Sequence, residues 1–272
     1  DLGYPEDESI PALYQRLISD SGTLNGDAIT EEYERILAEA DELVASSFER
    51  RPPGVLEVIG GDVGAYYSPG SFDGTRPGRF FARITGTEPV YKMRSLAYHE
   101  GIPGHHYQIS LAATADLPFF RALVGNDGYI EGWALYAEYL ASDLGWYEGD
   151  PYGDLGRLQH EALRACRMVV DTGIHVKGWG YDQSVEYMIE NTGLNQGFME
   201  YEVMRYISYP AQATAYLVGK NEILRMRTAA EEALGEDFVL KEFHSVILEN
   251  GSLPMDVLEE LIDEWVAKKI SG

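Results

Sequence analysis

The 272-residue sequence is poor in cysteine, in basic residues and in long apolar runs, and each shortage excludes a class of protein. Its single cysteine excludes a disulfide scaffold and a cysteine-based zinc finger. With 21 Lys and Arg against 45 Asp and Glu, the net charge is −24. We therefore expect no nucleic-acid partner, because phosphates attract basic surfaces. No run of about 18 apolar residues occurs, so we expect no membrane insertion.

The first residues contain neither an initiator methionine nor a basic-then-apolar signal pattern. We therefore expect a mature product or the C-terminal part of a longer protein, with an N-terminal half missing from this chain. The cytoplasm is the favoured location, and the periplasm or the exterior stays open if a signal peptide was removed. The terminal segments carry most of the acidic excess and suit solvated helix faces, so the chemistry is sought in the middle.

The pattern of hydrophobic residues predicts a mainly α protein with a small antiparallel β-sheet. Gly-Gly and Pro-Gly turns separate three short β-prone runs, which are 55–59, 63–68 and 79–84. From about residue 89 helical spacing dominates. We expect one catalytic domain over 1–272, with the sheet at about 55–85 and a helical metal-binding part at about 89–272.

Apolar residues at helical spacing, together with Gly and Pro punctuation, predict ten helices. Thr30 is a candidate N-cap for the second of them, and Arg51-Pro52-Pro53-Gly54 ends it. The predicted ranges are about 6–22, 30–50, 90–111, 127–143, 155–177, 182–192, 195–208, 210–232, 236–249 and 254–269.

Three of the six histidines lie within eight residues, at 99, 105 and 106. In the zinc-protease motif H-E-x-x-H, a spacing of four places two imidazoles on one helix face beside a catalytic Glu. Here His99-Glu100 is followed by Pro103 where the second histidine would stand, so the helix must kink. Such a kink can turn His105 toward His99, and we favour it over His106 as the second ligand.

A zinc site of this kind needs a third protein ligand and an open position for water. Glu131 and Glu138 lie seven residues apart on one face of an apolar, aromatic helix, where carboxylates are costly unless paired or ligating. We predict that Zn²⁺ is held by His99, His105 and Glu131. Glu138 either orients an imidazole or is a solvated helix residue.

Four ordered motifs resemble the bacterial domain-of-unknown-function-885 family. They are His-Glu-x-x-Pro-Gly-His-His at 99–106, Glu-Gly-Trp-Ala-x-Tyr-Ala-Glu at 131–138, Arg-x-Val-Val-Asp-Thr-Gly-Ile-His at 167–175 and Tyr-Pro-x-Gln-Ala-x-x-Tyr-x-x-Gly at 209–219. The family is distantly similar to gluzincin-type zinc peptidases such as carboxypeptidase Taq and thimet oligopeptidase. The resemblance implies a zincin-like helical metallopeptidase domain, zinc, and a peptide or small amide as substrate.

In the predicted mechanism, Glu100 takes the proton of a zinc-bound water as general base. The oxyanion then needs further donors, and the candidates are Tyr209, His175, Arg205 and Tyr206, with Tyr216 beside Gln212 and the Tyr66-Tyr67 pair as weaker ones. Asp171 stands four residues before His175 and can orient its imidazole.

The favoured function is a zinc-dependent metallohydrolase that acts on peptides. Two alternatives stay open, a hydrolase of a non-peptide amide or ester with the same site, and a non-catalytic metal-binding or interaction module. Other features have ordinary interpretations. We expect Cys166 in the core, His160 and His244 on helix surfaces, and Phe119-Phe120 in packing or along a substrate cleft.

Overall fold

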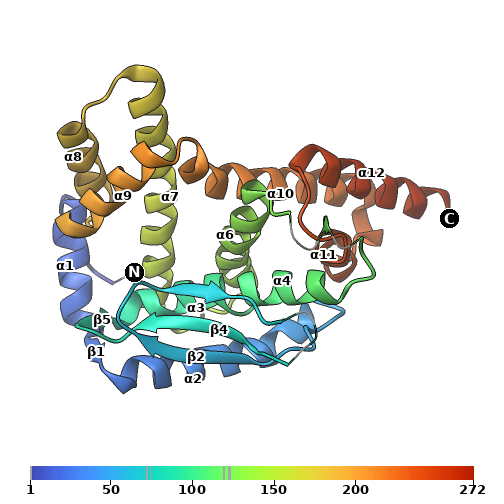
Figure 1. Cartoon of the computed structure of the whole chain (residues 1–272), viewed down its shortest axis with the longest axis horizontal. Coiled ribbons are helices and arrows are strands. Elements are labelled where there is room, and N and C mark those ends of the chain that lie inside the picture. Colours follow the sequence, from blue (N-terminus) through green and yellow to red (C-terminus); the bar gives the residue numbers. More distant parts are fainter. Residues whose placement is uncertain (1, 72, 74, 119, 122–123) are drawn as a thin grey trace.

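A computed structural model describes residues 2–71, 73, 75–118, 120–121 and 124–272, and it confirms a mainly helical protein (Figure 1). The helices of the described residues are α1 (Ile10–Ser21), α2 (Asp27–Leu43), α3 (Met93–Glu100), α4 (His105–Thr114), α6 (Asp127–Asp143), α7 (Pro151–Lys177), α8 (Tyr181–Thr192), α9 (Gln196–Ser208), α10 (Gln212–Leu234), α11 (Leu240–Leu248) and α12 (Met255–Ser271). Within these ranges no helix is both long enough and apolar enough to cross a membrane.

The three predicted strands are present and form one small sheet in the order β2-β4-β3. They are β2 (Leu56–Gly61), β3 (Tyr66–Ser68) and β4 (Gly78–Arg83). The β3–β4 pairing is antiparallel, as predicted, but β2 and β4 are parallel. The chain changes direction between β2 and β3 and again between β3 and β4. Strand β4 therefore runs in the same direction as β2 and pairs with it. A separate antiparallel pair joins β1 (Thr23–Asn25) to β5 (Thr87–Pro89).

The predicted helix 90–111 is broken into two helices at Gly101–Gly104. Helix α3 ends at Glu100 and α4 begins at His105. The kink expected at Pro103 is therefore a complete interruption, and the Ile102–Pro103 bond is cis. A Cβ at Gly104 would lie 2.0 Å from the carbonyl oxygen of His99, so only glycine fits at this position. The break brings the two histidines onto facing ends of successive helices.

The second predicted helix also starts earlier than expected. It begins at Asp27 after Gly26, and the hydroxyl of Thr30 donates to the carbonyl oxygen of Asp27. The prediction that Thr30 caps this helix is therefore wrong. Further along, Cys166 is buried as expected, and burial raises the pKa of its thiol to about 11.

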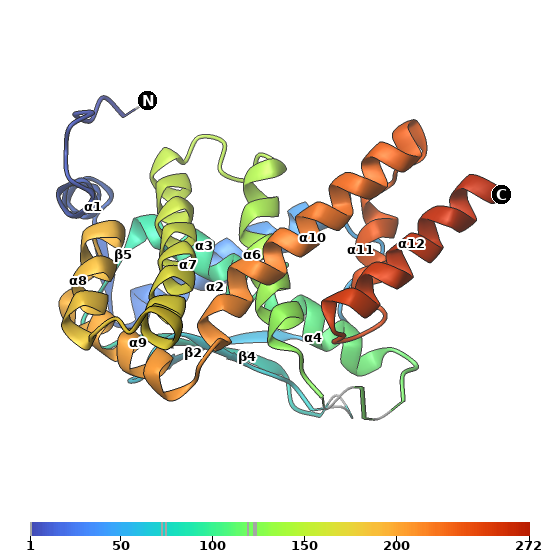
Figure 2. The ribbon, with the colours of Figure 1, turned by 90° about the horizontal axis from the view of Figure 1, so that it is seen from above.

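Helices α6 and α10 cross with almost no space between their backbones (Figure 2). A Cβ at Gly219 would lie 1.8 Å from the carbonyl oxygen of Gly128, and one at Gly132 would lie 2.6 Å from the Cα of Gly219. Glycine at these positions thus sets the distance of closest approach. The crossing fixes α6, which carries Glu131 and Glu138, against the rest of the helical layer.

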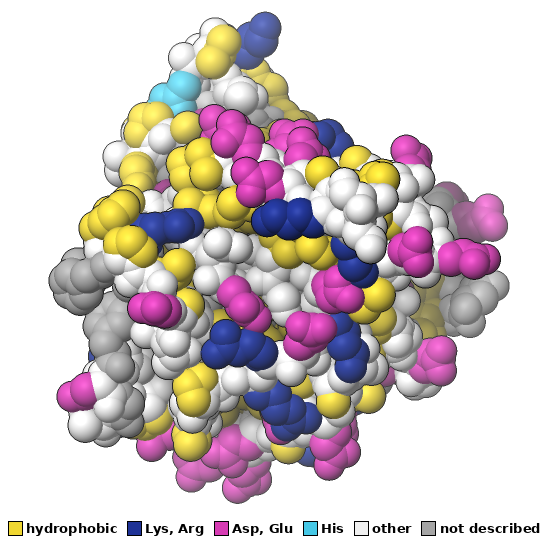
Figure 3. Space-filling model, turned by 90° about the vertical axis from the view of Figure 1, so that its right-hand side faces the viewer, with side chains coloured by type: hydrophobic (Ala, Val, Ile, Leu, Met, Phe, Trp, Pro, Cys, Tyr) yellow, Lys and Arg dark blue, Asp and Glu magenta, His cyan; other side chains and the backbone are white. Residues whose placement is uncertain are grey.

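On one face of the molecule, acidic side chains lie at several separate places (Figure 3). On the face shown in Figure 3, Lys and Arg lie among Asp and Glu. Exposed pairs such as Arg225 with Glu259, at 2.7 Å, are part of this mixture. Because such pairs are screened by salt, they contribute little to stability, and the acidic excess serves mainly solubility.

His244 is buried, so the prediction that it lies on a helix surface is wrong. Its ring stacks on Phe48, its Nδ1 donates to the carbonyl oxygen of Ser47 at 2.8 Å, and its Nε2 accepts from the hydroxyl of Tyr136 at 2.9 Å. Both ring nitrogens are satisfied by the neutral imidazole. Burial lowers the pKa of His244 from 6.5 to about 3.

Replacement of Gly219 by alanine is expected to lower the free energy of unfolding by about 3 kcal/mol, because the added methyl group overpacks the α6–α10 crossing. Gly197→Ala, on the exposed surface of α9, is the matched control and should be neutral or stabilising by up to about 1 kcal/mol. Urea unfolding of both variants checks this. Equal stability of the two variants would contradict the close crossing.

Stability is expected to fall as the pH drops below 6.5, because His244 binds a proton in the unfolded chain before it does in the folded protein. The effect is absent above pH 6.5 and reaches about 2 kcal/mol for this residue at pH 5. His244→Gln keeps a donor and an acceptor but cannot be protonated. Urea unfolding between pH 7 and 5 should show a shallower pH slope in this variant, and identical slopes would refute the assignment.

Candidate functional site

Three side chains from three helices meet in one buried cluster. His99 lies near the end of α3, His105 begins α4, and Glu131 lies in the second turn of α6. Oε2 of Glu131 is 3.5 Å from Nε2 of His99 and 3.3 Å from Nε2 of His105. A ligand atom from each of the three lies within 4.8 Å of the other two. These are the three residues that the sequence predicted as metal ligands.

The cluster leaves one buried oxygen without a proper donor. Among the described residues, Oε2 of Glu131 has no hydrogen-bond partner, although Nε2 of His105 and Nε2 of His99 lie 3.3 and 3.5 Å away. Burial raises the pKa of Glu131, but the charges of His105 and His99 outweigh it, so this pKa lies well below its ordinary value. Two imidazole nitrogens and a carboxylate oxygen form a donor set typical of zinc. The residues present therefore fit a divalent zinc ion.

Glu138 holds His99 in position from behind. Its carboxylate accepts from Nδ1 of His99 at 2.7 Å, from Nη2 of Arg164 at 3.0 Å and from the hydroxyl of Ser95. The hydrogen bond between His99 and Glu138 occupies Nδ1 of His99, so Nε2 is the nitrogen that faces Glu131. The sequence left two roles open for Glu138, and the structure shows the first of them, a carboxylate that orients an imidazole.

His160 belongs to the same network, and the prediction that it lies on the surface is wrong. Its Nδ1 lies 3.1 Å from the hydroxyl of Ser95, and its side chain is buried where α7 packs against α3. Burial lowers the pKa of His160 to about 4, although Glu138 opposes this. The acidic and basic residues along α7 are typical of an exposed helix, so the sequence did not predict that the face with His160 is buried.

The two neighbouring histidines of α4 point to different partners. The amide nitrogen of Gln108 lies 3.0 Å from Nδ1 of His105 and donates to the carbonyl oxygen of Ile130. His106 instead lies with its Nδ1 3.1 Å from the hydroxyl of Tyr67, on the sheet. Burial lowers the pKa of His106 to about 4. The structure thus brings His105 into the cluster and directs His106 away from it.

Glu100 is buried next to His99, at the end of α3. Desolvation raises the pKa of its carboxyl group, while the charges of His99 and His105 act in the opposite direction. These interactions place Glu100 within the electrostatic field of the cluster. A raised pKa suits a carboxylate that must take up and later release a proton.

Tyr216, which the sequence ranked below Tyr209, is the phenol that contacts the cluster. Its ring stacks on His99, with centroids 6.3 Å apart and an interplanar angle of 14°. The guanidinium of Arg167 lies 4.6 Å from the centroid of the same ring. Tyr209 is 58% exposed, and its backbone N–H donates to Arg205 within α9. The structure does not bring Tyr209 to the cluster.

Arg205 and Tyr206 belong to a buried network behind Tyr216. Glu202 accepts from Arg167 at 2.7 Å, from Arg205 at 3.1 Å and from the hydroxyl of Tyr206 at 2.7 Å. Burial raises the pKa of Glu202, but the two arginines lower it to about 2. Glu202 thus holds both residues in the network behind Tyr216, and Arg205 also donates to the side-chain oxygen of Gln212 at the start of α10.

His175 and Asp171 do not form the expected pair. Nε2 of His175 donates to the carbonyl oxygen of Tyr206 at 3.0 Å. Asp171 accepts from the backbone N–H of Ala211, at 3.0 and 3.2 Å, and so holds the start of α10. Phe120 is 64% exposed, and Phe119 lies outside the described residues.

Sequence reasoning missed the roles of Arg164, Arg167 and Glu202. Arg167 entered the sequence analysis only as the first residue of the motif at 167–175, and Arg164 and Glu202 were not singled out. The spacing of three residues places the two arginines on one side of the helix with the apolar residues Leu163 and Val170, and this is the signal that could have found them, because buried arginines need carboxylate partners.

Comparison with known proteins identifies a family for this chain. Residues 3–262 match the family described as "Bacterial protein of unknown function (DUF885)", and the chain belongs to it. A solved "putative lipoprotein" from Colwellia psychrerythraea is 37% identical, with a TM-score of 0.85, over 98% of this chain and 46% of that one. A "putative lipoprotein of unknown function" from Shewanella oneidensis is 24% identical, with a TM-score of 0.82, over 95% and 50%. The chain thus spans about half the length of both. No curated protein matches it.

A zinc titration tests the assignment of the ligands. His105→Ala is expected to weaken zinc binding by more than the roughly 100-fold that loss of an orienting partner costs, because it removes a direct ligand. His106→Ala is the matched control and should keep about one zinc per chain, since His106 faces Tyr67. Metal analysis after gel filtration measures both. Loss of zinc from His106→Ala but not from His105→Ala would instead assign His106 as the ligand.

Proposed function

We propose that this chain is the catalytic part of a zinc-dependent metallohydrolase, with peptides as substrates. The observation that carries the proposal is the buried cluster of His99, His105 and Glu131, with Glu100 beside it. The unsatisfied oxygen of Glu131 supports a cation at this place. A zincin-like catalytic domain is part of the same proposal, and the distant resemblance to gluzincins favours it.

Each residue near the cluster has a chemical role in this proposal. Zinc held by His99, His105 and Glu131 would act as a Lewis acid and make water a better nucleophile near neutral pH. Glu100 takes a proton from the attacking water and passes it to the leaving amine. The phenol of Tyr216 can donate to the oxygen on which negative charge develops.

The two alternatives differ from this proposal in different ways. A hydrolase of a non-peptide amide or ester would use the same residues, so only the substrate distinguishes it. A non-catalytic metal-binding or interaction module has no use for Glu100, a buried carboxylate beside the cluster that is not one of its ligands. Burying such a group costs free energy, which favours the catalytic functions.

The proposal extends to the place of the protein in the cell. Both solved relatives are described as lipoproteins, which supports a location in the cell envelope over the cytoplasm that the sequence favoured. The same relatives are about twice as long as the chain, so the proposed activity is to be measured on a longer protein as well as on this chain.

Glu100→Gln is expected to lower the rate of peptide cleavage by at least about 100-fold, because the amide cannot accept the proton of the attacking water. Zinc content should remain unchanged. Glu34→Gln, an exposed position on α2, is the matched control and should cleave at the wild-type rate. The measurement is a peptide-library digest with and without a chelator, on this chain and on a longer protein with an N-terminal half.

Two results would count against this proposal. Cleavage by the zinc-loaded Glu100 variant at the wild-type rate would remove Glu100 as the base. Zinc binding without cleavage of any peptide, by this chain and by the longer protein, would favour an ester or non-peptide amide substrate or a non-catalytic role.

A further inference from the structure

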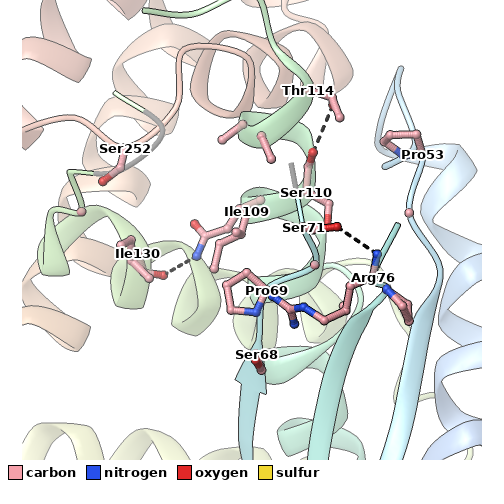
Figure 4. Close-up of a pocket in the computed structure, with 18 of the residues that line it drawn as sticks. Pro53, Ser68, Pro69, Ser71, Arg76, Ile109, Ser110, Thr114, Ile130 and Ser252 are labelled. Atoms are coloured by element: carbon pink, nitrogen blue, oxygen red, sulfur yellow. Dashed lines mark hydrogen bonds between the residues drawn. The ribbon is translucent and has the colours of Figure 1, made fainter. Parts of the chain in front are cut away.

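A cavity of about 840 Å³ borders Gln108, the residue whose amide contacts His105. The loop between β3 and β4, helix α4, the start of α6 and the turn before α12 surround it. Figure 4 shows Ile130 and Ser252 on one side of it and Pro53 and Arg76 on the other. This volume is within the range of about 300–1,000 Å³ that small-molecule sites occupy.

The inner wall of the cavity is made of residues that also position the cluster. Gln108 lines it, and the amide of Gln108 lies 3.0 Å from Nδ1 of His105. Ile130 lines it as well and directly precedes Glu131 in α6. His99, His105 and Glu131 are not among the described residues that line the cavity, and Gln108 stands between the cavity and His105.

Most of the described lining is apolar. The apolar side chains on the helical side are Ile109, Ala112, Ala113, Val124 and Ile130. Burying one bulky aliphatic or aromatic side chain against such a surface contributes about 1.5–3 kcal/mol. The cavity thus fits the side chain of an amino-acid residue such as leucine or phenylalanine.

Among the described charged residues that line the cavity, Arg121 and Arg76 have no carboxylate partner, and the guanidinium of Arg76 has no hydrogen bond either. Glu57 is paired with Arg79 at 3.1 Å, and Arg121 donates to the carbonyl oxygen of Asn250 at 2.6 Å. Within the described part of the chain, no carboxylate pairs with the guanidinium of Arg76. Although the net charge of the protein is −24, the guanidinium of Arg76 can attract and bind a carboxylate locally.

We propose that the cavity selects substrates, holding a bulky apolar residue on the side of Gln108 opposite His105 while Arg76 binds a carboxylate of the same molecule. The substrate class is then short peptides or N-acyl amino acids that end in an apolar residue with a free carboxylate. This inference rests on the proposed function, but the binding it requires can be measured without zinc and without hydrolysis.

Binding is measured by calorimetry on the full chain in the presence of a chelator. Three probes separate the two contributions: N-acetyl-phenylalanine, its amide, which lacks the carboxylate, and N-acetylglycine, which lacks the apolar group. N-acetyl-phenylalanine should bind tightest, and each of the other two should bind about tenfold more weakly or worse, as loss of about 1.4 kcal/mol implies. Equal binding of all three probes would overturn the proposal.

Two variants locate the binding. Ala113→Phe fills the cavity and should weaken N-acetyl-phenylalanine binding by more than about tenfold. Its matched control, Ala229→Phe on the exposed face of α10, should not change binding. Arg76→Gln should remove the preference for the acid over the amide, whereas Arg83→Gln, also exposed, should retain it. Because Arg76 is exposed, its variant remains informative if Ala113→Phe fails to fold.

The outcomes separate this inference from the proposed function. Peptide cleavage that depends on Glu100, together with no effect of Ala113→Phe or Arg76→Gln on probe binding, would overturn the cavity assignment alone. Probe binding that both variants weaken, without cleavage of any peptide or N-acyl amino acid, would overturn the role of the cavity in substrate selection. The expected result is that the wild type prefers substrates with an apolar C-terminal residue. Ala113→Phe and Arg76→Gln should weaken both probe binding and the cleavage of such substrates.

Discussion

The buried carboxylate of Glu138 is the constraint on which the site depends. A carboxylate taken out of water costs several kcal/mol unless donors surround it. Ser95 and His99 from α3 and Arg164 from α7 supply those donors, so one side chain of α6 ties three helices together. Removing any donor would leave the charge underpaired. The orientation of His99, and hence the geometry of the cluster, follows from satisfying Glu138.

The packing of the helices serves the same end. The α6–α10 crossing, limited by Gly132 and Gly219, brings Tyr216 over His99. Arg167 closes the other side of Tyr216 and is itself held by Glu202. A chain of contacts therefore runs from α9 through α7 and α10 to the cluster, which explains why motifs far apart in sequence converge on one region.

Residue type and spacing were enough to find the cluster, and enough to place most helices. His99, His105 and Glu131 were identifiable because their side chains are costly in apolar helices unless they are paired or ligating. The choice between His105 and His106 depends on the break at Gly101–Gly104, which spacing alone does not describe. Tyr216 and Arg167 were harder to rank, because their contacts join helices almost fifty residues apart. The direction of β2 relative to β4 likewise depends on the order of strands in space.

Gln108 has a consequence for the energetics of the whole site. Its amide contacts His105 on one side, and it forms part of the cavity wall on the other. A shift of this amide would alter both the cavity wall and the contact with His105. Occupancy of the cavity and affinity at the proposed zinc site would then be thermodynamically linked. Such linkage is reciprocal: whatever factor a cation contributes to the affinity for an organic molecule, that molecule contributes to the affinity for the cation. A ligand that strengthened cation binding at the proposed zinc site would therefore itself bind more tightly when the cation is present.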